Sequence, residues 1–205
     1  MSSESLIKYK IILASNSSIR KKILEDSGIP FEVIPSEVVE EDLKQSLSSD
    51  NFRDYCLALA KAKALDVSNK KKNAYVIGSD QICCYEKEIF SKPLTKENCF
   101  KTLSKLSGNT HYQNCGISIC KDGEEIWSHY AQAALTMKSL SDSEIKDYID
   151  KDEPFMACGA YRFESLGKNL FSSTKGDETT IQGLTLKPIL SFLTSKKIID
   201  ISNFH

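Results

Sequence analysis

The chain has 205 residues, of which 40% are hydrophobic and 27% charged, a composition typical of a soluble globular protein. Its formal net charge of −1 gives no overall attraction to nucleic acid or to a membrane surface, so neither partner is expected. No apolar run is long enough for a signal peptide or a membrane span, and the seven cysteines form no CxxC pair. These features predict reduced thiols and a cytoplasmic location.

Segments with strand and helix character alternate along the chain. We predict strands at residues 9–14, 31–34, 74–79, 81–85, 111–120 and 124–138, and helices at residues 17–27, 51–67, 96–107, 141–150 and 188–195. An acidic loop is expected between the second strand and the second helix. The mixture predicts an α/β architecture in a single elongated domain over residues 1–205, with a deep cleft.

Residues 10–24, KIILASNSSIRKKIL, combine an apolar strand, a Ser-rich turn and three cations. A strand that ends in such a turn and leads into a helix directs free backbone N–H groups at one place. Arg20 adds a planar fork suited to phosphate oxygens. Taken alone, the stretch is compatible with an anion site but favours an ordinary capped helix with a solvated basic face.

Several polar residues are predicted at or near the ends of elements, where α/β folds place their sites. Asp80 follows the apolar run VIG, and Lys92 precedes a proline that biases its backbone towards an extended conformation. Glu40 belongs to the acidic loop and Lys63 to the second helix, where solvated side chains are the usual finding. Together with Arg20 they supply two carboxylates and three cations, the groups that metal-dependent phosphoryl chemistry requires. No GxxxxGK[ST] motif is present, which argues against a P-loop enzyme.

In chain order, the stretches LASNSSIRKKIL, LAKAKA, VIGSDQ, SKPLT, LSG and CGAYRFESLG resemble the Maf family of nucleoside triphosphate pyrophosphatases, over about residues 11–193. The resemblance implies a mixed twisted sheet with flanking helices and a deep central cleft, like that of the inosine triphosphate pyrophosphatases. It also implies hydrolysis of a small-molecule nucleoside triphosphate to the monophosphate and pyrophosphate, with Mg²⁺ or Mn²⁺, and allows a homodimer. The sequence GSDQ, in place of GADT, resembles the branch that removes 7-methyl-GTP.

The resemblance also assigns roles to individual residues. The phosphates would be bound by Ser15, Arg20, Lys21, Lys63 and Lys92. The metal would be held by Glu40 and Asp80, and Asp80 would also accept the proton of the attacking water. Substrate choice would be governed by Ile19, Gln81 and Glu164.

The chain departs from the family pattern at a few positions. Ser18 stands where the family usually has proline, and Met156 where an Asp or His usually follows Glu-Pro. Val39 replaces an acidic residue, which predicts weaker metal binding. Two alternatives remain open. The first is a dTTP or UTP pyrophosphatase of the sister branch, against which GSDQ and Glu164 argue. The second is a nucleotide-binding regulator of septum formation, which would not need a proton acceptor at Asp80.

Overall fold

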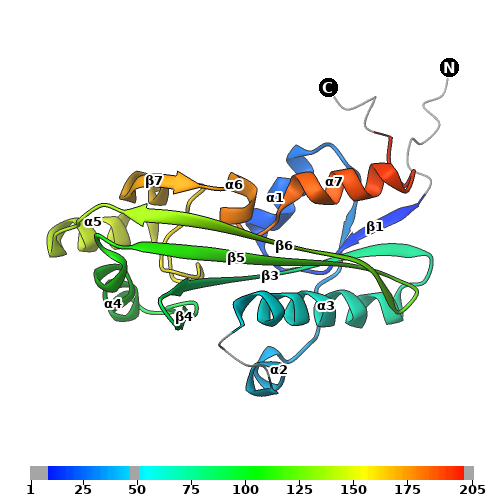
Figure 1. Ribbon diagram of the computed structural model, residues 1–205, viewed down its shortest axis with the longest axis horizontal. Helices are drawn as coiled ribbons and strands as arrows, with labels where there is room; N and C mark the ends of the chain where they lie inside the picture. The colour runs from blue at the N-terminus through cyan, green and yellow to red at the C-terminus, as the bar shows by residue number, and fades with distance from the viewer. Residues whose placement is uncertain (1–8, 47–50, 201–205) are drawn as a thin grey trace.

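The computed structural model describes residues 9–46 and 51–200, which fold around one mixed seven-stranded sheet (Figure 1). The strands are β1 (Lys10–Leu13), β2 (Glu32–Val33), β3 (Ala74–Tyr85), β4 (Glu88–Phe90), β5 (Thr110–Lys121), β6 (Glu124–Met137) and β7 (Phe171–Lys175). Their order is β2-β1-β3-β5-β6-β7, with β4 paired to β3; β1 is parallel to β2 and β3, and the other pairings are antiparallel. The predicted fold class, α/β with a mixed sheet and flanking helices, is confirmed.

Helices cover both faces of the sheet (Figure 1). One face carries α3 (Phe52–Lys70), with α2 (Glu40–Ser46) beyond it, and the other carries α1 (Ser18–Asp26), α6 (Glu178–Ile181) and α7 (Leu186–Ser195). At one end of the elongated molecule lie α4 (Lys96–Leu106) and α5 (Asp142–Asp152), and a 3₁₀ helix, η1 (Leu166–Leu170), precedes β7. Among the described residues, no helix is both long and apolar enough to cross a membrane.

Local sequence signals account for many of the element boundaries. Ser17 caps α1 and Thr95 caps α4, each by accepting a hydrogen bond from a backbone N–H of the first turn. Ser141 and Glu144 form the reciprocal capping box of α5. The strands predicted at residues 111–120 and 124–138 are present as β5 and β6, which form a hairpin that turns at residues 122–123. The short elements β4, β7 and α6 were not predicted.

The prediction of two strands at residues 74–79 and 81–85 is wrong. They form the single strand β3, so Asp80 lies in the middle of a strand and not just beyond its end. The strand continues because β5 pairs with it along nearly its whole length, with Gly116 opposite Asp80. A polar side chain therefore does not break this strand, since the backbone ladder is complete on the β5 side.

The prediction of an acidic loop around Glu40 is also wrong, because Glu40 is the first residue of α2. The first turn of α2 contains three acidic residues. Negative side chains at a helix N-terminus are stabilised by the helix dipole, so the same acidity that suggested a solvated loop favours the start of a helix.

One edge of β3 is paired by two different strands with a gap between them. β1 pairs with residues 74–77 and β4 with residues 83–85, while β5 occupies the opposite edge. Residues 78–82 therefore face the gap. The chain leaves parallel β1 in the direction of the gap, and antiparallel β4 also ends beside it, since Phe90 lies opposite Cys83. The topology thus brings two distant chain segments to Asp80 from opposite sides.

Helix α3 lies very close to the sheet because two glycines face it. A Cβ atom on Gly78 would lie 2.2 Å from the carbonyl oxygen of Ala60, and one on Gly116 would lie 2.5 Å from that of Cys56. Carbon and oxygen atoms that are not bonded do not approach so closely, so a side chain at either glycine would displace the helix. This close seating brings Lys63 of α3 within reach of Asp80 of β3.

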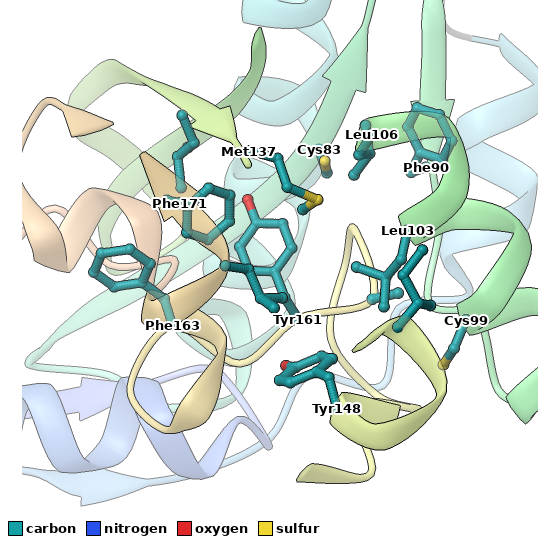
Figure 2. Close-up of a cluster of buried hydrophobic side chains, with 14 of the residues drawn as sticks. Cys83, Phe90, Cys99, Leu103, Leu106, Met137, Tyr148, Tyr161, Phe163 and Phe171 are labelled. Carbon is teal, nitrogen blue, oxygen red and sulfur yellow. The ribbon is translucent and has the colours of Figure 1, made fainter. Parts of the chain in front are cut away.

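A hydrophobic cluster fills the end of the molecule near α4 and α5 (Figure 2). Tyr161 packs edge-on against Phe171, with ring centroids 4.8 Å apart, and Phe163 contacts the same ring. His111 of β5 is fully buried beside them, and its Nε2 atom lies 2.9 Å from the Tyr161 hydroxyl oxygen. Burial lowers the pKa of His111 to about 4, because desolvation disfavours the imidazolium.

We expect this buried histidine to make the fold sensitive to acid. In the unfolded chain His111 takes up a proton near its ordinary pKa of 6.5, whereas in the fold it stays neutral until about pH 4. Stability is therefore complete above pH 6.5 and is lost as the pH falls, by about 2 kcal/mol between pH 7 and pH 5. Urea unfolding of wild type, His111→Gln and the half-exposed control His129→Gln at both pH values measures this. The pH-dependent loss should shrink most in His111→Gln and less in His129→Gln, because burial also lowers the pKa of His129 but to a smaller extent. Equal losses in all three would contradict the assignment.

Candidate active site

A buried carboxylate and a lysine form the centre of the site. Asp80 is only 6% exposed, and its side chain points from the sheet towards α3. The Lys63 ammonium donates a hydrogen bond of 2.6 Å to Asp80 Oδ1 and lies 2.8 Å from Glu40 Oε1. Burial raises the pKa of Asp80, while the positive charges of Lys63 and Arg20 act against that rise and Glu40 adds to it.

The position of Lys63 follows from the pattern of its helix. Leu59, Ala60, Ala64 and Val67 of α3 are buried, so Lys63 lies within their stripe and not on the solvent side. Its side chain is 12% exposed. A cation inside an apolar stripe is the sequence signal that distinguishes this lysine from a surface lysine.

Arg20 reaches the same gap from α1, on the other face of the sheet. Its Nε atom donates to the carbonyl oxygen of Gly183 at 2.8 Å. Its Nη1 atom donates to the carbonyl oxygen of Ser79 at 3.0 Å and to the hydroxyl of Ser15 at 3.3 Å. These three acceptors are neutral, so they fix the guanidinium without cancelling its charge. The N-terminus of α1, with Ser17 as its cap, lies beside it and adds the positive end of a helix dipole.

The remaining predicted phosphate ligands are exposed. Lys92 follows β4, on the side of the gap opposite to α1. Lys21 lies 3.4 Å from Glu25 in an ion pair on the outer surface of α1. The structure therefore brings Ser15, Arg20 and Lys63 directly to the gap. It directs the chain that carries Lys92 towards the gap. Lys21 is paired with Glu25, away from the gap.

A cavity of about 240 Å³ lies beside α1. Ile19 and Glu164, far apart in sequence and both predicted to govern substrate choice, line it together. Its other lining residues are Lys22, Ile23, Asp26, Phe163, Lys168, Glu178 and Gln182. Gln81 is not part of the lining, because its amide donates to the carbonyl oxygens of Thr180 and Ile181 at 3.2 and 2.5 Å. It anchors α6 next to the cavity.

The two acidic residues fit a divalent cation. One oxygen of Asp80 and one of Glu40 converge on the same ammonium group, so they point at a common position. Mg²⁺ is usually held by one or two carboxylates together with substrate phosphates and water. Among residues 9–46 and 51–200, no group of three or more His, Cys, Asp or Glu side chains that could hold a metal is present. Val39, beside Glu40, offers no further oxygen, and the expected weakening of metal binding stays a prediction.

The sequence of residues 10–196 matches the family model for Maf-like proteins. The chain belongs to the Maf family. A nucleoside triphosphate pyrophosphatase of Legionella pneumophila (strain Paris) is 39% identical over 199 residues, covering 97% of this chain and 100% of that protein. A nucleoside triphosphate pyrophosphatase of Pelagibacter ubique is 38% identical, and the match covers 90% of this chain and 96% of that protein. The predicted family and enzyme class are thereby confirmed.

Among solved structures, this Maf chain is similar to the Ham1 protein of Staphylococcus aureus, with a TM-score of 0.44 and 14% identity. The similarity covers 91% of the Maf chain and 99% of that protein.

Sequence reasoning missed several parts of this Maf site. Gly183 and Ser79 hold Arg20 through their carbonyl groups, which no side-chain pattern reveals. Phe163 and Lys168 also line the cavity. The only sequence signal for their role was that they lie close to Glu164 along the chain. These residues meet the N-terminal turn only through tertiary packing.

Proposed function

We propose that this Maf protein hydrolyses a nucleoside triphosphate to the monophosphate and pyrophosphate, with 7-methyl-GTP as the favoured substrate. The observation that carries the proposal is the buried Asp80 carboxylate, held by the Lys63 ammonium in the gap that the Arg20 guanidinium enters from the other face. A proton acceptor surrounded by fixed cations suits attack on a phosphate chain. The relatives named nucleoside triphosphate pyrophosphatase support the same activity.

In the proposed reaction, Asp80 accepts a proton from the water that attacks the α-phosphorus. The bond from the water oxygen to phosphorus forms, the bond to the bridging oxygen breaks, and pyrophosphate leaves with the electron pair. Burial strengthens Asp80 as a base, while Lys63 and Arg20 favour its ionised form. Arg20, Lys63 and Lys92 neutralise the negative charge that develops on the leaving group, with Ser15 beside them. A divalent cation held by Asp80 and Glu40 would supply further charge neutralisation at the phosphate oxygens.

The cavity beside Arg20 would receive the base. Guanine has two donors on its Watson–Crick edge, and the Glu164 carboxylate can accept both. Methylation at N7 gives the ring a positive charge, which the same carboxylate attracts. Phe163 lines the cavity and offers an aromatic face for cation–π attraction, whereas Tyr161 is buried against His111 and is not available. Ile19 of α1 supplies a further apolar contact in the lining.

Hydrolysis of 7-methyl-GTP, GTP, dTTP and UTP in oxygen-18 water, with Mg²⁺ and with Mn²⁺, tests this proposal. We expect the label in the nucleoside monophosphate, unlabelled pyrophosphate as the co-product, and kcat/KM highest for 7-methyl-GTP, then GTP. Label in free phosphate with a diphosphate product would contradict the pyrophosphatase mechanism. A preference for dTTP or UTP would assign the chain to the sister branch and leave the mechanism intact.

A further inference from the structure

Glu164 lies within a tight turn that is built around one carbonyl group. The backbone N–H groups of Ser165 and Gly167 both donate to the carbonyl oxygen of Arg162, at 3.1 and 3.0 Å. Glu164 lies inside this turn and lines the cavity. Its direction therefore depends on how the turn is attached to the rest of the protein.

A single buried carboxylate attaches the turn at both ends. Asp152, the last residue of α5, is 4% exposed. Its Oδ1 atom accepts a hydrogen bond from the Ser165 hydroxyl at 2.6 Å, and its Oδ2 atom accepts one from the Tyr148 hydroxyl at 2.8 Å. The Tyr148 oxygen in turn accepts from the backbone N–H of Arg162 at 2.9 Å. The ring of Tyr148 lies below Tyr161 in Figure 2.

The Arg162 side chain lies between this buried carboxylate and Glu164. Its Nη1 atom is 3.7 Å from Asp152 Oδ1 and donates to the Asp152 carbonyl oxygen at 3.3 Å. Its Nε atom donates to Glu164 Oε1 at 3.4 Å, and both oxygens of the carboxylate keep lone pairs that can accept the two donors of guanine. The guanidinium therefore holds Glu164 at a defined place.

The buried position of Asp152 at the C-terminal end of α5 would by itself destabilise the fold. A buried carboxylate must be compensated for lost hydration, and the C-terminal end of a helix disfavours negative charge. Among the described residues, this compensation comes from groups of the Glu164 turn and from Tyr148. A rigid turn lowers the entropy lost when Glu164 binds a base, so the arrangement preorganises the cavity wall.

We propose that Asp152 is a positioning residue for base selection, which fixes Glu164 through Ser165, Tyr148 and Arg162. It does not reach the base itself. The inference rests on the proposed function, because it requires that Glu164 read the base. It adds a residue on α5, outside the cavity lining, to the determinants of specificity.

Asp152→Asn tests the inference, because the amide keeps the shape but presents a donor to a hydroxyl that donates. We expect the ratio of kcat/KM for 7-methyl-GTP over dTTP to fall about 10-fold, through a higher KM for 7-methyl-GTP, with kcat for dTTP within about twofold of wild type. Asp150→Asn is the matched control: it removes an exposed carboxylate of the same helix, paired with Lys96, and should change neither value. Ser165→Ala, which removes one hydrogen bond, should lower the ratio to a smaller extent.

Glu164→Gln provides the reference for an effect that reaches the base through Glu164. It should lower the same ratio, and the double variant Asp152→Asn/Glu164→Gln should be no worse than the poorer single variant, because both changes act on one contact. If Glu164→Gln lowers the ratio but Asp152→Asn and Ser165→Ala do not, the inference is overturned and the proposed function stands. Equal losses of kcat on both nucleotides would also overturn it, since they indicate general damage. An unchanged ratio in Glu164→Gln would overturn the proposed base selection together with the inference.

Discussion

Asp80→Asn should reduce the rate of 7-methyl-GTP hydrolysis by ~10²–10⁴-fold, the usual effect of removing a general base, with any loss of metal binding adding to it. Asparagine has the same shape, but it cannot accept the proton and it is a poorer ligand for a divalent cation. The backbone pairing of residue 80 with Gly116 does not involve the side chain, so β3 should be unaffected. Lys63 keeps a partner in Glu40, which limits the damage around the ammonium.

The same substitution should not lower the stability of the fold. Burial raises the pKa of Asp80, so the native state binds its proton more readily than the unfolded chain does. The ionised carboxylate therefore opposes folding at neutral pH, and a neutral amide removes that penalty. Urea unfolding at pH 7 should give a free energy equal to or above that of wild type. The control for turnover is Asp66→Asn, which removes a carboxylate of α3 that pairs with Lys70 and should hydrolyse the substrate at the wild-type rate. Near-normal turnover in Asp80→Asn would contradict the role of Asp80.

Lys63→Gln should lower kcat by about 10²–10³-fold at pH 7, because a fixed charge at the phosphate site is lost. A second effect follows from the two carboxylates. Burial and Glu40 raise the pKa of Asp80, and Lys63 opposes that rise more strongly than Arg20 does, so removing Lys63 lets the pKa of Asp80 rise further. Asp80 then becomes protonated at a higher pH, and the acid limb of the profile of kcat/KM against pH should move upwards. Activity should recover in part as the pH is raised.

Lys61→Gln is the charge-matched control for this experiment. Lys61 also lies on α3, but it pairs with Glu125 at 3.0 Å and is half-exposed. Its loss removes the same charge from the same helix without touching Asp80, so the pH profile should coincide with that of wild type. Coincident acid limbs for Lys63→Gln and wild type, or equal losses for the two lysine variants, would contradict the proposed coupling.

The sequence predicts the parts of the fold that local chemistry controls. Caps such as Ser17, Thr95 and the box at Ser141 have defined hydrogen-bonding patterns, and the β5–β6 hairpin alternates around a short turn. It does not predict the continuity of β3 through Asp80, because that depends on a partner strand from residues 110–121. The helical start at Glu40 was missed because acidic residues are as typical of loops as of first helical turns.

The site was predictable in its residue types and less so in its geometry. Asp80 and Lys63 were singled out from single positions, but their contact depends on how closely α3 approaches the sheet. Arg20 was predicted to bind phosphate, but the three neutral acceptors that hold its guanidinium, two of them backbone carbonyls, were not predicted. Such acceptors have no signature in sequence. The meeting of Ile19 and Glu164 in one cavity likewise depends on packing between α1 and the turn before η1.

The two glycines under α3 have a consequence for how this protein can evolve. Neither Gly78 nor Gly116 has a side chain to offer a substrate, yet a single methyl group at either would lift the 19 residues of α3 off the strands. The ammonium of Lys63 would rise with the helix while the carboxylate of Asp80 stayed on its strand. The clearance between helix and sheet therefore sets the distance between the Lys63 ammonium and the Asp80 carboxylate. We therefore expect selection for catalysis to retain glycine at positions 78 and 116, because no side chain larger than a hydrogen atom fits there.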